Sequence, residues 1–165
     1  MNTTVHVIGI DPGLVDTGIV FVTFNRKIKL ITLQTTVITR GTGKQVAAAV
    51  DGFAYSSRDV FVFIEGYRSR SNFSGDARMI GLVKEIKDET GGKAMNNTGI
   101  KKVVKNALLD ILHMRRFSTL THHADLESAA RILVLGMLKD DKLNGLLSDI
   151  VKDYLASKPW DVVIT

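Results

Sequence analysis

Apolar positions group into short β-type runs over the first 65 residues and into helical spacings after them. The run from Val5 to Ile10 is apolar almost throughout, which is typical of a central strand covered on both faces. Further strands are predicted at 17–24, 27–37 and 59–65, with a short one at 93–95. Helices are predicted at 44–55 and 74–89, from Thr98 to about Leu112, and from Thr121 onward.

The order of these elements predicts a mixed sheet in an α/β fold. The first three strands are separated only by short turns, so we expect them to form an antiparallel meander. The helix at 44–55 then leads into the strand at 59–65. A crossover of this kind places the later strand parallel to the first, with a right-handed connection.

Two of the predicted strands end in a carboxylate. Asp11 follows the first apolar run and precedes Pro12 and Gly13, and Glu65 closes the strand at 59–65. Taken singly, Asp11 is equally typical of a turn and Glu65 of a solvated rim. At the carboxyl ends of adjacent parallel strands, however, two carboxylates repel each other unless a cation lies between them. The pair therefore predicts a metal site.

The helix that begins near Thr121 carries the second group of candidate ligands. His122 and Asp125 are three residues apart, so at a helix start they lie on one face and can reach a single cation. His123 replaces His122 in this role if the helix begins one residue differently. We expect Glu127 to be structural, in a surface ion pair with the residue four positions on, Arg131.

Composition narrows the class of protein. The chain has 165 residues, is 45% hydrophobic and has no linker-like segment, so we expect one domain over 1–165. A net charge of +5 favours an acidic partner such as nucleic acid. Without cysteine there is no disulfide framework and no thiolate metal site. The chain lacks both a signal-peptide pattern and a membrane-length apolar run, so we expect a soluble cytoplasmic protein without membrane contacts.

Taken together, these motifs resemble the RuvC family of Holliday-junction resolvases in the ribonuclease H-like superfamily. The resemblance rests on Ile10-Asp11-Pro12-Gly13, Thr17-Gly18, Ile64-Glu65 and His122-x-x-Asp125, and it extends over nearly the whole chain. It implies a five-stranded mixed sheet flanked by helices, and a homodimer with the helix at 74–89, through Met79, Ile80, Gly81 and Val83, as its interface. The short chain indicates a phage- or virus-type member, acting in the cytoplasm of a bacterial host.

The resemblance also implies the active-site residues and the reaction. The active site would consist of Asp11, Glu65, His122 and Asp125, with Lys101 as a catalytic basic residue. These four ligands would hold two Mg²⁺ ions, with Mn²⁺ as a substitute, for phosphodiester hydrolysis. His122 departs from the carboxylate of many relatives, and its role as metal ligand or as general base stays open.

Basic and aromatic residues near the expected site are candidates for DNA binding. The loop after Glu65 interleaves Tyr67, Arg68, Arg70 and Phe73, a composition suited to phosphate contacts and base stacking. An alternative for Phe73 is a hydrophobic staple at the following helix. Lys101, Lys102 and Lys105 are further candidates, although for any one of them a solvated helix face is the more ordinary explanation.

Three alternatives to a junction resolvase remain. Asp-x-Gly followed by Thr-Gly also resembles the first phosphate motif of actin-like ATPases and sugar kinases, but those proteins need a second domain to close their cleft. A related ribonuclease H-like nuclease would act on RNA, flaps or forks rather than on four-way junctions. A non-cleaving junction-binding protein is the third, against which the four candidate ligands argue.

Overall fold

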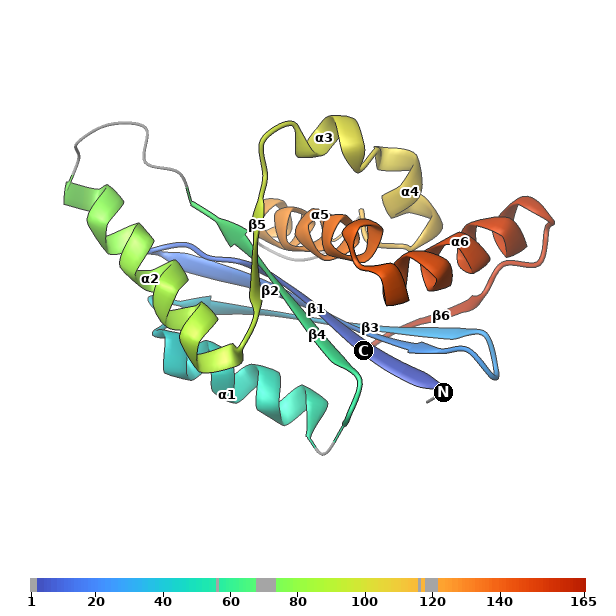
Figure 1. The fold of residues 1–165 in the computed structure, drawn as a ribbon, viewed down its shortest axis with the longest axis horizontal. Helices are drawn as coiled ribbons and strands as arrows, with labels where there is room; N and C mark the ends of the chain where they lie inside the picture. The colour runs from blue at the N-terminus through green and yellow to red at the C-terminus, as the bar shows by residue number, and fades with distance from the viewer. Residues whose placement is uncertain (1–2, 56, 68–73, 116, 118–121) are drawn as a thin grey trace.

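The computed structural model describes residues 3–55, 57–67, 74–115, 117 and 122–165 (Figure 1). Within them, six strands form one sheet in the order β5-β4-β1-β2-β3-β6. The strands are β1 (Thr4–Asp11), β2 (Asp16–Asn25), β3 (Leu30–Thr39), β4 (Val60–Gly66), β5 (Lys93–Asn96) and β6 (Asp161–Ile164). The helices are α1 (Gly43–Ala54), α2 (Ser74–Thr90), α3 (Ile100–Val103), α4 (Asn106–Ile111), α5 (His123–Lys139) and α6 (Asp141–Leu155).

The centre of the sheet agrees with the prediction. Strands β1, β2 and β3 form the antiparallel meander, and β4 pairs in parallel with β1. In this register Asp11 lies opposite Gly18 of β2, and Ile10 lies opposite Ile64 of β4. The residues that follow this last pair are Asp11 and Glu65, so both carboxylates reach the same edge of the sheet.

Helices cover both faces of the sheet (Figure 1). Successive residues of β1 contribute to opposite sides, because side chains alternate along a strand: Val7 packs in the core beneath α5 and α6, and Ile8 in the core beneath α1 and α2. The burial of both sets explains why β1 has no polar face. None of the helices in the described part of the chain is long and apolar enough to cross a membrane.

The C-terminal part of the chain adds a strand and a helix that were not predicted. The predicted α/β class and mixed sheet are confirmed, but the sheet has six strands rather than five among the residues that the structure describes. Strand β6 pairs in parallel with β3. The chain leading into it is fixed by Asp153, whose carboxylate accepts a hydrogen bond from Trp160 Nε1 at 2.9 Å and pairs with Lys29 Nζ at 2.9 Å.

The helix predicted from Thr98 to Leu112 is broken in two. Val104 has an extended backbone (φ −96°, ψ 91°), so α3 ends before it and α4 begins at Asn106. Arg131 of α5 stabilises the break, because its Nη1 donates to Val104 O at 2.8 Å and its Nη2 to Asn106 Oδ1 at 2.6 Å. Lys105 therefore precedes α4 instead of lying in the first turn of one continuous helix.

Two further boundaries differ from the prediction. Strand β3 begins at Leu30 rather than Lys27, because Asn25 Oδ1 accepts hydrogen bonds from the backbone of Lys27 and Ile28 and holds the chain in a turn. Helix α5 begins at His123, and His122 precedes it with a left-handed backbone (φ 73°).

The surface of α2 differs from the interface predicted for it. Val83 is 9% exposed, and Met79 packs against the same core beneath α1 and α2. Ile80, 47% exposed, and Gly81 lie on the outer surface instead. Half of the residues proposed for a dimer contact therefore serve the protein's own core.

Candidate functional site

The carboxyl ends of β1 and β4 bring Asp11 and Glu65 into direct contact. The two side chains share a hydrogen bond, with the protonated carboxyl of Asp11 donating to Glu65. On its other side, Glu65 Oε1 accepts a hydrogen bond from Asn97 Nδ2. Asn97 directly follows β5, which lies beside β4, so three consecutive positions across the sheet edge supply these groups.

The pKa of Asp11 reflects this crowding. Burial is the largest cause of an increase that takes the pKa to about 9, and the hydrogen bond and charge of Glu65 and the charge of Asp125 add to it. A hydrogen bond donated by the Ser128 hydroxyl acts in the opposite direction. A divalent cation reverses this balance, because it stabilises the ionised carboxylates, which would repel one another without it.

Two glycines allow α5 to approach the sheet closely enough to deliver Asp125. A Cβ at Gly9 would lie 2.1 Å from Ala129 O, and a Cβ at Gly18 would lie 2.8 Å from Asp125 O. Ala129 is itself fully buried, as expected for a helix packed closely on a sheet. Because Gly18 pairs with Asp11, this contact sets the backbone of Asp125 beside the end of β1.

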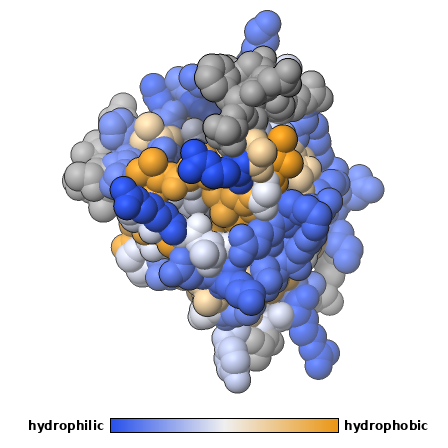
Figure 2. Space-filling view, turned by 90° about the vertical axis from the view of Figure 1, so that its left-hand side faces the viewer, coloured by the Kyte–Doolittle hydropathy of each residue, from blue (hydrophilic) through white to orange (hydrophobic). Residues whose placement is uncertain are grey.

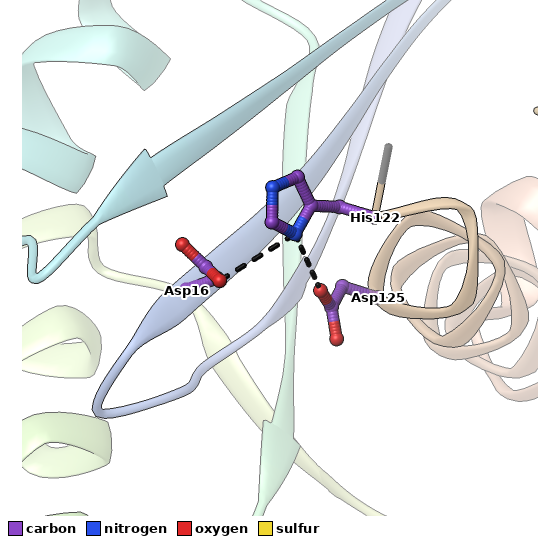
Figure 3. A group of neighbouring side chains, drawn as sticks. All are labelled: Asp16, His122 and Asp125. Atoms are coloured by element: carbon purple, nitrogen blue, oxygen red, sulfur yellow. Dashed lines mark ion pairs between the residues drawn. The ribbon is translucent and has the colours of Figure 1, made fainter. Parts of the chain in front are cut away.

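A second group of ligand atoms surrounds His122 (Figure 3). The Nδ1 atom of His122 lies 3.4 Å from Asp16 Oδ2 and 3.6 Å from Asp125 Oδ2. One ligand atom from each of these three residues lies within 4.8 Å of the others, a spacing that suits a metal ion. Asp125 thus belongs to both groups, since its charge also acts on Asp11.

Sequence reasoning missed Asp16. It opens β2 opposite Thr39, whose Oγ1 donates to Asp16 Oδ1 at 2.8 Å and orients the carboxylate toward His122. A signal was available, because a tight connection between β1 and β2 returns residues 16–18 to the edge at which Asp11 lies. His122 is the histidine of this group, and His123 faces a different part of the site.

His123 and Glu65 both line a cavity of about 360 Å³. Its wall also contains Asn97, Lys101 and Glu127. Glu127 forms the expected ion pair with Arg131, at 2.7 Å between Oε1 and Nη2, but the pair is not a surface one. The Arg131 side chain is only 8% exposed, because its guanidinium also holds the α3–α4 break.

Only some of the predicted DNA-binding residues lie in the described part of the chain. Lys101, Lys102 and Lys105 are exposed on and beside α3. Tyr67, directly after β4, is 38% exposed. Arg68, Arg70 and Phe73 lie outside the described residues.

Figure 2 views the end of the molecule toward which β1 and β4 run, where hydrophobic residues appear among hydrophilic ones.

The donor set of this edge fits a hard divalent cation. Asp11, Glu65, Asp125 and Asp16 provide carboxylate oxygens, and His122 adds one imidazole nitrogen. Oxygen-rich sites suit Mg²⁺ and Mn²⁺, and an imidazole favours Mn²⁺ of the two. The two groups joined through Asp125 are therefore a candidate metal centre.

Comparison with solved structures identifies the fold. Thermus thermophilus RuvC in complex with a Holliday junction substrate matches with a TM-score of 0.52 and 20% identity, over 79% of this chain and 90% of that one. The nuclease domain of the large terminase g2p from bacteriophage SPP1, with bound Mn, matches with a TM-score of 0.44 and 11% identity, over 79% and 85%. No protein-family model and no curated protein matches the sequence. The chain has the ribonuclease H-like fold.

Proposed function

We propose that the chain is a metal-dependent endonuclease that hydrolyses phosphodiester bonds in branched DNA such as four-way junctions. The observation that carries this proposal is the convergence of Asp11, Glu65 and Asp125, from three separate elements, at the carboxyl edge of the sheet. Open α/β sheets bind their ligands at this edge. Glu65 and Asp125 beside the largely buried Asp11 raise the pKa of Asp11, which makes its ionised form costly, and binding a cation is a function that accounts for the cost.

Asp11, Glu65, His122 and Asp125 are the proposed metal ligands, and Asp16 joins them. Mg²⁺ or Mn²⁺ at this centre, with two ions per site, would act as a Lewis acid on the phosphodiester and supply a nucleophile at neutral pH. Asp16 either contributes an oxygen or orients His122, as carboxylates commonly do for ligating histidines. Lys101, exposed at the rim of the neighbouring cavity, is the proposed catalytic cation that faces the phosphate.

Branched DNA is the proposed substrate because both the resemblance to RuvC and the net positive charge of the chain favour it. The solved structure of similar fold is described in complex with a Holliday junction substrate. The net charge of +5 and the exposed Lys101, Lys102 and Lys105 favour phosphate contacts. Tyr67, Arg68, Arg70 and Phe73 are proposed to contact the branch point. Forks and flaps share a branch point with junctions and are secondary substrates.

A homodimer is proposed for the resolution of symmetric junctions. Two matched cuts call for two identical sites related by a two-fold axis. On α2 the exposed Ile80 and Gly81 are available for the contact, whereas Met79 and Val83 are not. Sedimentation at micromolar concentration, with and without a synthetic junction, should detect a dimer in at least one condition, and a monomer in both would refute it.

A substrate panel tests the proposed function. Purified protein should cut a labelled four-way junction in Mg²⁺ or Mn²⁺ at least about tenfold faster than linear duplex of the same sequence, and should not cut it in EDTA. Equal rates on all DNA structures, or faster cutting of an RNA–DNA hybrid, would instead identify a nuclease of another specificity. Binding without cutting in either metal would indicate a junction-binding protein.

A further inference from the structure

The cavity beside Glu65 has residues from three separate segments of the chain in its wall. It lies between the end of β4, the segment 97–101 and the first turns of α5, and has a volume of about 360 Å³. That volume is at the small end of the range for ligand pockets, about 300–1,000 Å³. Since Glu65 belongs to both the cavity wall and the candidate metal centre, any occupant would lie next to the reacting phosphate.

The walls of the cavity suit a flat heterocycle. Ile100 and Ile132 supply apolar surface. Asn97, Glu127 and Ser128 supply polar groups, and Lys101 is exposed. Most of the lining is polar or charged, and the few apolar side chains provide surface on which a small ring system can pack.

Glu127 is the polar group whose position is fixed most firmly. Its Oε1 atom accepts a hydrogen bond from Arg131 Nη2 at 2.7 Å. Arg131 is immobilised in turn by Val104 O and Asn106 Oδ1. The Glu127 side chain is 29% exposed, so its carboxylate is still accessible. A carboxylate held this way is a preorganised acceptor for N–H donors.

We propose that this cavity receives one unpaired guanine from the DNA strand next to the cut bond, with Glu127 accepting hydrogen bonds from the guanine N1–H and N2 amino groups. This inference rests on the proposed function. Enzymes that take up an unpaired base read it through its Watson–Crick edge. Guanine presents two adjacent donors on that edge, which match the two oxygens of a carboxylate. Lys101 at the rim contacts the adjoining phosphate.

The first test measures base preference with a pool of four-way junctions randomised at the positions flanking the branch. Sequencing of the products should reveal one position at which wild type favours guanine by about tenfold, the discrimination typical of a bidentate contact. Glu127→Gln retains an oxygen for Arg131 but replaces one acceptor by a donor, so the preference should disappear. Glu89→Gln, on the exposed surface of α2, is the matched control and should preserve it.

A second variant covers the case in which Glu127→Gln does not fold. Ala124 is exposed at the cavity wall, and Ala124→Phe should fill the cavity without touching the Arg131 network. It should abolish the guanine preference while Mg²⁺ still raises the unfolding temperature. Replacing the preferred guanine by inosine, which lacks the N2 amino group, should slow wild type about tenfold and leave Ala124→Phe unaffected.

The outcomes separate this inference from the proposed function. If wild type cuts no DNA in Mg²⁺ or Mn²⁺, the proposed function fails and the cavity's role fails with it. If wild type cuts junctions without favouring guanine at any position, or if Glu127→Gln or Ala124→Phe keeps the wild-type preference, only the role of the cavity is overturned.

Discussion

Replacing Asp11 by Asn should stabilise the metal-free protein, and increasingly so as the pH rises. The pKa of Asp11 is raised in the fold to about 9 from the ordinary value of 3.8. The folded state therefore holds the proton more tightly than the unfolded chain does, and the stability that this provides is lost as the pH rises from about 4 toward 9. Asparagine keeps the shape of the side chain and removes the titration.

The size of the expected stability difference follows from how much unfolding free energy wild type loses with each pH unit. Each pH unit between the two pKa values costs about 1.4 kcal/mol, so between pH 5 and pH 8 wild type should lose about 4 kcal/mol relative to Asp11→Asn. Urea unfolding in EDTA at several pH values measures this difference directly. Asp51→Asn, on the exposed surface of α1, is the control and should follow wild type at every pH.

Metal completes the test of this reasoning. Mg²⁺ or Mn²⁺ at pH 8 should restore stability to wild type, because a bound cation favours the ionised carboxylates, and should do much less for Asp11→Asn. If the difference in the free energy of unfolding between wild type and Asp11→Asn stays constant from pH 5 to pH 8, Asp11 does not keep its proton in the folded protein and the account is refuted.

Three further predictions concern the surroundings of Asp11. Asp16→Asn removes a carboxylate 3.4 Å from His122 Nδ1 and should weaken Mn²⁺ binding by about 10- to 100-fold in a calorimetric titration; unchanged affinity would exclude a role in the metal centre. Gly18→Ala places a Cβ 2.8 Å from Asp125 O, so it should lower the free energy of unfolding by about 1–3 kcal/mol and slow junction cutting, and wild-type values for both would contradict the close approach of α5. Lys101→Gln should reduce the slope of log affinity against log salt by about 0.9 for a junction, as expected for one lost phosphate contact, whereas an unchanged slope would place Lys101 away from the DNA.

The sequence is most informative where local pattern and structure coincide. The apolar run ending at Asp11 and the run ending at Glu65 required only the rules for buried strands and right-handed crossovers, and the structure has both strands as neighbours. The resemblance to RuvC led to the ribonuclease H-like fold, which the structure has. The roles of Asp11, Glu65, His122, Asp125 and Lys101 stay predictions.

The features that were missed depend on contacts between distant parts of the chain. The break between α3 and α4 depends on Arg131, which lies 27 residues after the Val104 carbonyl that it binds. The environment of Asp16 depends on the strand register that brings it opposite Thr39. Strand β6 is four residues long and pairs with β3, from which it is far separated in sequence. Periodicity within a short window contains none of this information.

Cleavage of a synthetic four-way junction by wild type and by Asp11→Asn tests the central claim most directly. In Mg²⁺ or Mn²⁺, wild type should cut the junction, and Asp11→Asn should bind it with similar affinity while cutting at least about a thousandfold more slowly, as expected when about 4 kcal/mol of transition-state stabilisation is lost. Cutting by Asp11→Asn at the wild-type rate would contradict the assignment of the carboxylate edge as the active site.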